Sequence, residues 1–146
     1  YLKNGILVHG GGWKKLEKIK IDNKTFRKKI YSNYKIKNIY NYYGLIEQTG
    51  SIFIECPECL SLKCSIFSDV IIRDKNLKIV KRDNEVGLLQ IMSTVPTSYP
   101  GNIILTEDLA EFKNKKKCSR CKNFKGKRFV IHGRMKNSEI RGCANT

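Results

Sequence analysis

SIFIEC, at residues 51–56, begins a series of short segments that are rich in Ile, Val and Phe. The later members of the series are CSIFSDVIIRD at 64–74, LKIV at 77–80, EVGLLQIM at 85–92, GNIILTEDLAEF at 101–112 and KRFVIHGR at 127–134. Turn residues such as those at 82–84 separate them, which is typical of antiparallel strands. The pattern therefore predicts an antiparallel β layer, in which 101–112 is a strand that runs into a polar loop.

The first part of the chain has a different pattern. GILV at 5–8 predicts a short buried strand, which ends at the glycines of HGGGW at 9–13. Asp22 and Asn23 are candidate N-caps for a helix over TFRKKIYSNY at 25–34. The apolar residues of this stretch recur every four positions, so they form one stripe while the basic side chains face water. The predicted fold class is mixed α/β, with an α/β segment followed by an antiparallel β-rich layer.

The length of 146 residues is enough for one domain with its own core. The chain opens on Tyr1 rather than Met and stops directly after RGCANT, so we expect a fragment of a longer protein. No apolar run is long enough to span a membrane and no signal peptide is visible, so we expect a cytoplasmic location.

The formal net charge of +16 makes a polyanionic partner worth considering. Basic residues gather at 14–20, 27–29 and 115–117, where they could steer ATP or CoA as well as nucleic acid. Charge alone carries no base readout, and the plentiful Lys, Ile, Asn and Tyr are typical of a compositional bias. We therefore expect no specific nucleic acid partner. A basic zinc-knuckle module that stacks single strands on its tyrosines is the alternative from another class.

Three short motifs carry residue types suited to nucleotide chemistry. Asn41-Tyr42-Tyr43-Gly44-Leu45-Ile46-Glu47 could stack a base and hold Mg²⁺, although an ordinary turn with an exposed Glu is commoner. In Leu105-Thr106-Glu107-Asp108, the last carboxylate could accept from two ribose hydroxyls or cap the next turn. Gly133-Arg134, followed by Ile140-Arg141-Gly142, offers a guanidinium for a ribose, a phosphate or a surface carboxylate.

The order and spacing of the three motifs are more specific than any one of them. Together they resemble the adenylate-forming superfamily of acyl-CoA synthetases, luciferases and peptide-synthetase adenylation domains. Within that superfamily, YGLIEQTGSIFIECPEC at 43–59, GLLQIMSTVPTSYPGNIILTEDLAE at 87–111 and HGRMKNSEIRGCANT at 132–146 resemble the acyl-protein synthetases. These are the fatty-acid ligases of bacterial bioluminescence reductase systems, and they are related to the phenylacetate–CoA ligases.

The resemblance implies a division of the chain. Residues 1–132 would be the C-terminal portion of the large adenylate-forming domain, with Cys knuckles over 56–121. Residues 133–146 would be the hinge and the start of a small C-terminal domain. The family's phosphate loop and catalytic lysine would lie outside this chain, so we expect the chain alone to be inactive.

The resemblance also implies roles for single residues in an ATP site. Tyr43 would pack on adenine, and Glu47 would help to hold Mg²⁺. Asp108 would bind the ribose hydroxyls, and Arg134 the ribose or phosphate. The family has Thr where this chain has Ile46, so the hydroxyl contact to phosphate would be absent or supplied elsewhere.

Further positions follow from the same resemblance. Gly11 and Gly12 of HGGGW occupy the place of the family's Gly-Gly turn at the adenine pocket, and Gly44 follows the stacking tyrosine. Lys136 occupies the hinge position, about which the small domain would swing between adenylation and transfer.

The six cysteines indicate metal binding or thiol chemistry, because no secretion signal is visible. Cys56 and Cys59 form one Cys-x-x-Cys pair, and Cys118 and Cys121 form another, with Cys64 close behind the first. Four thiolates are the set that a tetrahedral structural Zn²⁺ prefers. The long gap between the pairs leaves free buried thiols as an alternative. The related phenylacetate–CoA ligases carry a metal-binding cluster at comparable places, which favours zinc.

The sixth cysteine, Cys143, lies outside both pairs. In the acyl-protein synthetases a cysteine near the C-terminus accepts the acyl group as a thioester, and this one is similarly placed. Lys136 and Arg141 could favour its thiolate, although a small buried packing residue is an equal alternative. For His9 and His132, each at a strand end, we expect satisfied structural histidines.

The reaction implied by the resemblance has two steps. A fatty or aryl carboxylate attacks the α-phosphate of Mg·ATP, giving an acyl-adenylate and pyrophosphate, and a thiol then displaces AMP. If Cys143 is the acceptor, the product is an acyl-protein for a reductase partner. If CoA is the acceptor, the enzyme is a phenylacetate-type acyl- or aryl-CoA ligase.

Overall fold

The computed structural model describes residues 2–10, 12, 18–97, 100–114 and 117–135 of the chain. Within these residues the strands form one nine-stranded sheet in the order β1-β2-β3-β4-β9-β8-β7-β5-β6. The elements are β1 (Ile6–Gly10), α1 (Asn23–Tyr34), β2 (Asn38–Tyr43), η2 (Ile46–Gln48), β3 (Phe53–Glu55), β4 (Leu62–Lys63), β5 (Ser68–Arg73), β6 (Ile79–Val80), β7 (Gly87–Ser93), β8 (Ile103–Phe112), η3 (Ser119–Cys121) and β9 (Arg128–Arg134). The predicted mixed α/β class is confirmed. No helix in the described ranges combines the length and apolar character needed to cross a membrane.

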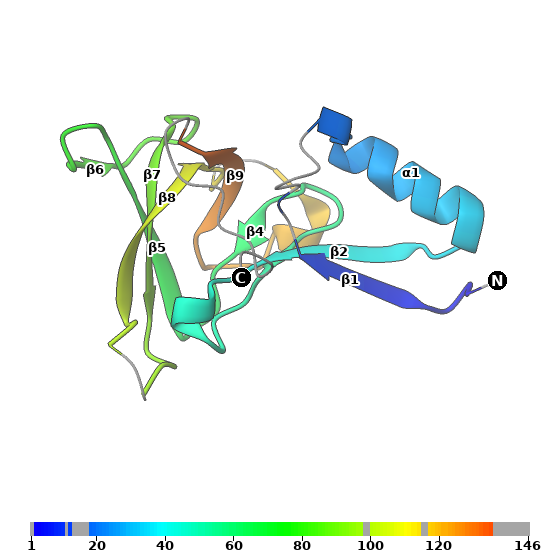
Figure 1. Cartoon of the computed structure of the whole chain (residues 1–146), viewed down its shortest axis with the longest axis horizontal. Coiled ribbons are helices and arrows are strands. Elements are labelled where there is room, and N and C mark those ends of the chain that lie inside the picture. Colours follow the sequence, from blue (N-terminus) through cyan, green and yellow to red (C-terminus); the bar gives the residue numbers. More distant parts are fainter. Residues whose placement is uncertain (1, 11, 13–17, 98–99, 115–116, 136–146) are drawn as a thin grey trace.

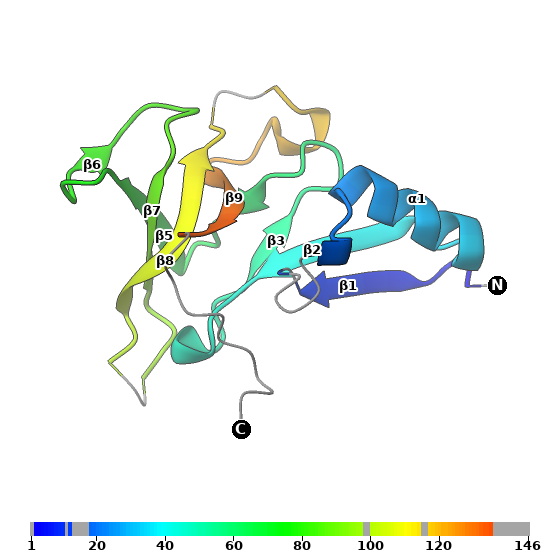
Figure 2. The ribbon, with the colours of Figure 1, turned by 45° about the horizontal axis from the view of Figure 1, so that its top comes forward.

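The first part of the sheet is an α/β unit in which α1 lies over β1 and β2 (Figure 2). β1 and β2 are parallel, as the connecting helix requires. Asp22 caps α1 by accepting a hydrogen bond from the backbone N–H of Thr25. The helix predicted over 25–34 is confirmed, and it begins two residues earlier.

A buried ion pair ties α1 to the sheet. Arg27 donates to the carboxylate of Glu55, the last residue of β3, and to the backbone carbonyl of Ile39 in β2. The side-chain amide of Asn23 donates to the other oxygen of the same carboxylate over 2.9 Å. Because the Glu55 side chain is only 5% exposed, its charge depends on these donors rather than on water.

The second part of the sheet is antiparallel throughout, in the order β9-β8-β7-β5-β6, which confirms the predicted β layer. Its most deeply buried residues are Val70, Ile72, Leu89, Ile91, Ala110 and Phe129. The strand predicted over 101–112 is confirmed as β8, which ends at Phe112. The residues from 110 to 112 are buried, so they hold the strand in the sheet, and the polar segment before them is absorbed as a bulge.

β4 joins the two parts of the sheet through a very short ladder (Figure 1). Its two residues, Leu62 and Lys63, pair with β3 on one side and with β9 on the other. Beneath this ladder the ring of Phe53 from β3 meets the ring of Phe129 from β9 edge to face, with centroids 5.4 Å apart. We call this region, Leu62–Lys63 with Phe53 and Phe129, the β4 joint.

β1 is a terminal strand of the sheet, and α1 covers only one of its faces. On the covered face, the ring of His9 contacts Phe26 of α1 with centroids 4.7 Å apart. On the opposite face, Ile6, Val8 and Ile54 are each at least half exposed. Within the described residues, neither this face nor the outer edge of β1 has a partner strand or helix.

Replacing Arg27 by Met should destabilise the fold by about 3 kcal/mol. The substitution leaves the buried carboxylate of Glu55 without its positively charged partner, while Met keeps most of the apolar part of the arginine side chain. The measurement is the free energy of unfolding from urea denaturation. The matched control is Lys28→Met, which removes an exposed positive charge from the same helix and should change stability by less than about 0.5 kcal/mol. Equal stability of the two variants would show that the ion pair does not anchor α1.

Candidate functional site

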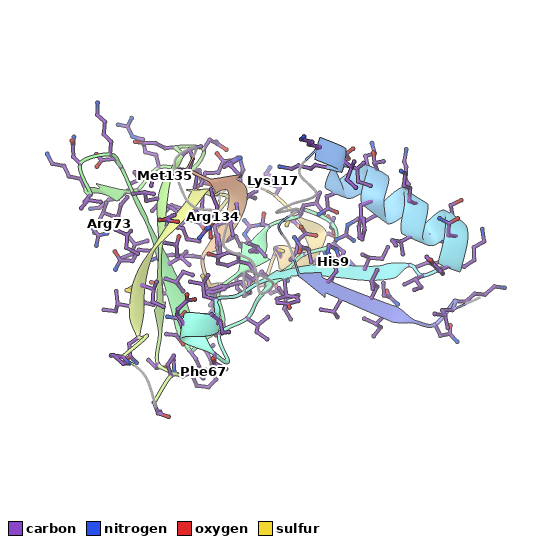
Figure 3. All side chains as sticks on the ribbon, in the orientation of Figure 1. His9, Phe67, Arg73, Lys117, Arg134 and Met135 are labelled. Atoms are coloured by element: carbon purple, nitrogen blue, oxygen red, sulfur yellow. The ribbon has the colours of Figure 1, made fainter. Side chains whose placement is uncertain are left out.

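The side chains of Tyr43, Asp108 and Arg134 meet where β2, β8 and β9 approach one another. Figure 3 shows Arg134 at the end of β9. The Tyr43 hydroxyl donates to Oδ2 of Asp108 over 2.6 Å. Arg134 is the partner of Asp108 in the β8–β9 ladder, and its Nε lies 3.7 Å from Oδ1 of Asp108. Tyr43 and Asp108 are 65 positions apart in the sequence, so only the fold brings them together.

A bulge in β8 presents Asp108 to Tyr43. In the β7–β8 ladder, the three residues 106–108 stand opposite the single residue Leu89. The Thr106 hydroxyl fills the gap, because it donates to the Leu89 carbonyl over 2.8 Å and accepts from the Asp108 N–H over 3.1 Å. Bulges of this kind redirect side chains next to functional sites. The spacing of the motif gave no sign of the role of Thr106.

β9 has an irregularity beside this bulge. The β8–β9 register passes over His132, and the next residue, Gly133, has a φ of +135°, which favours glycine. The His132 imidazole lies 3.2 Å from the carboxylate of Glu111, so the prediction of a satisfied structural histidine is confirmed there. Beyond Gly133, Arg134 also lies 3.3 Å from the carboxylate of Glu107.

The surroundings of Tyr43 keep its hydroxyl protonated. Burial and the negative charge of Asp108 raise the pKa of Tyr43 well above its ordinary value. The phenol is therefore a fixed donor to Oδ2 of Asp108, and its ring packs against Phe53 with centroids 6.2 Å apart. Oδ1 of Asp108 stays beside the guanidinium of Arg134, which places an acceptor for hydroxyls next to a cation for phosphate.

Glu47 does not join this group. It lies in η2, is exposed, and makes no hydrogen bond or ion pair with another described residue. Gly44 is the exposed residue that follows Tyr43, and a Cβ there would meet the Ser51 carbonyl oxygen at 3.2 Å. The predicted role of Glu47 in holding Mg²⁺ stays a prediction.

The four cysteines of the two Cys-x-x-Cys pairs come together in one cluster. Cys56 and Cys59 lie between β3 and β4, and Cys118 and Cys121 lie in and just before η3, between β8 and β9. The sulfur atoms are 3.8 Å apart in the pair 56–118 and 3.7 Å in the pair 59–121, and all four lie within 4.8 Å of one another. A tetrahedron with Zn–S bonds of about 2.3 Å has its sulfurs about 3.8 Å apart, so this donor set fits zinc.

Glu58 links the two halves of the cysteine cluster, a role that the spacing of the cysteines did not reveal. From the first Cys-x-x-Cys turn, its carboxylate accepts from the backbone N–H groups of Ser119 and Arg120 and from the Ser119 hydroxyl. These hydrogen bonds, that of the hydroxyl foremost, lower the pKa of Glu58. One turn is thus held against the other by a charged acceptor.

A model of the family described as "Acyl-protein synthetase, LuxE" matches residues 1–146, the whole chain. The chain belongs to the acyl-protein synthetase family. The suspected resemblance is thereby confirmed. No individual curated protein sequence matches the chain.

Solved structures similar to this acyl-protein synthetase chain are adenylate-forming enzymes. McyG A-PCP complexed with phenylalanyl-adenylate is 20% identical, with a TM-score of 0.56, over 90% of this chain and 25% of that one. The luciferase-like enzyme from the mealworm Zophobas morio is 18% identical, with a TM-score of 0.54, over 92% and 32%. PA1221, an NRPS protein containing adenylation and PCP domains, is 12% identical, with a TM-score of 0.53, over 88% and 28%. The chain thus spans about a quarter to a third of these structures, and the likeness shows the fold alone.

His9 and Asn41 are neighbours in the register of the parallel strands β1 and β2 of the acyl-protein synthetase chain. Neither His9 Nε2 nor Asn41 Oδ1 has a hydrogen-bond partner among the described residues. Burial lowers the pKa of His9, so its imidazole is neutral at pH 7. Among the described residues, the prediction of a satisfied structural histidine is therefore not met at Nε2 of His9, whose ring packs on Phe26 of α1.

The structure describes only some of the remaining residues predicted for the acyl-protein synthetase site. Gly12 is exposed and has a φ of +64°, a backbone conformation that favours glycine. Gly11, Lys136 and Cys143 lie outside the described residues, and the hinge predicted over 133–146 is described only as far as 135. Their roles, and the domain division, stay predictions.

Proposed function

We propose that the complete protein activates a fatty carboxylate as an acyl-adenylate at the expense of Mg·ATP and transfers the acyl group to a thiol. The meeting of Tyr43, Asp108 and Arg134 carries this proposal, because it joins an aromatic ring, a ribose acceptor and a phosphate-binding cation at one place. Membership of the acyl-protein synthetase family and the adenylate-forming fold support it. They favour it over a nucleic-acid-binding module, which needs none of these contacts.

The roles of the three residues in adenylation follow from their contacts. The carboxylate of the substrate attacks the α-phosphorus, the bond to the β-phosphate oxygen breaks, and pyrophosphate leaves. Asp108 binds the ribose through its remaining acceptor sites while Tyr43 holds it in place. Arg134 lies beside Asp108 and offsets negative charge on the ribose phosphate. Magnesium would neutralise charge on the β- and γ-phosphates, with Glu47 as its expected ligand.

The acceptor of the acyl group is Cys143 in this proposal. Attack of its thiolate on the carbonyl of the acyl-adenylate forms a thioester and releases AMP. The acyl-protein would then serve a reductase partner, as the family resemblance implies, in the reducing environment of the cytoplasm. Transfer to CoA instead, as in a phenylacetate-type ligase, is the rival outcome of the experiment below.

We infer in addition that Cys56, Cys59, Cys118 and Cys121 hold one structural zinc ion. Two of their sulfur separations, 3.8 and 3.7 Å, match the edge of a zinc–thiolate tetrahedron, and all four sulfurs lie within 4.8 Å of one another. Four protein ligands fill the coordination sphere, which leaves no position for substrate, so the ion would cross-link the chain rather than catalyse. Cys64 is not part of the cluster, and burial raises the pKa of its thiol to about 12.

Asp108→Asn should lower kcat/KM for carboxylate-dependent ATP–pyrophosphate exchange by about 10- to 100-fold, because it removes the charged acceptor for the ribose. The control is Glu85→Gln, the same carboxylate-to-amide change at an exposed residue with no hydrogen bond to another described residue. If folded Asp108→Asn protein catalysed the exchange at the wild-type rate, the assignment of the ribose site to Asp108 in β8 would be wrong.

Cys143→Ser should abolish covalent labelling of the complete protein by radioactive fatty acid and ATP. The wild-type label should be released by hydroxylamine, as a thioester is, and Cys64→Ala should keep it. ATP–pyrophosphate exchange should persist in Cys143→Ser, since the first step does not use the thiol. Label that survives the serine substitution would exclude Cys143 as the acceptor.

One zinc ion per chain should be found by mass spectrometry of the protein purified without chelators. Cys121→Ser should lose the ion, because three thiolates and a hydroxyl bind zinc far more weakly, whereas Cys64→Ala should retain it. A metal-free wild-type protein with four titratable free thiols in the cluster would contradict the assignment.

A further inference from the structure

The nucleotide site is assembled from two parts of the sheet whose strands pair at the β4 joint. Buried hydrogen bonds from Gln48 to the Gly101 carbonyl and between Ser51 and Ser93 also connect the two parts. Tyr43 ends β2 and pairs with Phe53 of β3, on one side of the joint. Asp108 and Arg134 belong to β8 and β9, on the other side. In the sheet order, β4 is the only strand between β3 and β9. The Tyr43–Asp108 hydrogen bond therefore depends on how these two parts are held together.

The backbone of the β4 joint is too short to fix that arrangement alone. β4 forms two residue pairs with β3 and two with β9. An isolated ladder of this length is at best marginally stable in water, because it fixes many dihedral angles for few hydrogen bonds. The edge-to-face contact of Phe53 and Phe129 adds about 1 kcal/mol beyond its buried area.

The cysteine cluster crosses the same joint. Cys56 directly follows β3, three residues after Phe53, which pairs with Tyr43. Cys118 and Cys121 belong to the segment that connects β8 to β9, the strands of Asp108 and Arg134. The two Cys-x-x-Cys turns lie side by side between the two parts of the sheet in both ribbon views (Figures 1 and 2). Besides the sulfur contacts, Glu58 bridges the two turns through hydrogen bonds from Ser119 and Arg120.

We propose that the four thiolates are positioning groups of the nucleotide site: by clamping β3 to the β8–β9 connection, the bound metal sets the meeting of Tyr43 with Asp108. This rests on the proposed function. Its thermodynamic content is a coupling, since a ligand that stabilises one side of the closed joint stabilises the other. Bound nucleotide should then increase the affinity for the metal, and bound metal should increase the affinity for the nucleotide, by the same factor.

The test measures that factor in both directions on the complete protein, with AMP as the probe because AMP needs no magnesium. Calorimetry gives the Kd for AMP of zinc-replete protein, of protein stripped with a chelator, and of stripped protein reloaded with zinc. We expect stripping to weaken AMP binding about tenfold and reloading to restore it. An unchanged Kd in stripped protein that keeps its circular dichroism spectrum would overturn the coupling.

The reverse direction needs no metal-free protein, so it decides the matter even if stripped protein unfolds. The Kd for zinc, measured on native protein by equilibrium competition with a chromophoric chelator, should fall about tenfold when AMP is saturating. A zinc ion that stabilised only its own turns would bind with the same Kd with and without AMP, and that result would refute the proposal.

Two variants sharpen the comparison. Glu58→Gln keeps all four thiolates but weakens the bridge to Ser119, so it should weaken zinc binding and AMP binding together. Glu85→Gln makes the same change at an exposed residue outside the cluster and the β4 joint, and it should change neither. Loss of AMP binding by zinc-replete wild-type protein would refute the proposed function itself, whereas equal AMP binding in the two metal states would refute only the coupling.

Discussion

The pairing of β4 with β9 is the constraint on which the rest of the molecule depends. Two residues, Leu62 and Lys63, connect an α/β unit that supplies Tyr43 to an antiparallel unit that supplies Asp108. Burial of Phe129 at this point joins the cores of the two units. A change in the angle between β4 and β9 would alter the distance between the phenol of Tyr43 and the carboxylate of Asp108. The packing of Phe53 on Phe129 and the Tyr43–Asp108 hydrogen bond therefore need the same arrangement of the strands.

The polar site itself is made by departures from regular strand geometry. Residues 106–108 leave the β7–β8 ladder, and His132 leaves the β8–β9 ladder one step away. The Thr106 hydroxyl stabilises the first departure by its hydrogen bonds. Gly133 permits the second, because glycine adopts a positive φ at little cost. Regular strands would alternate these side chains between the faces of the sheet, whereas the paired irregularities bring Asp108 and Arg134 to the same place.

The sequence predicted which residues form this site better than it predicted the strand irregularities and contacts that bring them together. Tyr43, Asp108 and Arg134 were identifiable because each stands in a short motif with a chemical reason for its residue types. The bulge at 106–108 was not, since an alternating pattern that fails over three residues reads equally well as a loop. Neither the contacts of Glu58 nor those of His9 have a periodic signature, because they are made with segments far away in the chain.

The outer face of β1 has a practical consequence. Ile6 and Val8 stand exposed beside a strand edge whose N–H and C=O groups have no neighbouring strand among the described residues. Such an edge is a template for intermolecular pairing, and the adjacent side chains make that pairing favourable. Recombinant pieces that terminate here would gain free energy by stacking copies edge to edge, so a lysine at Ile6 or Val8 is the substitution that would keep them dispersed.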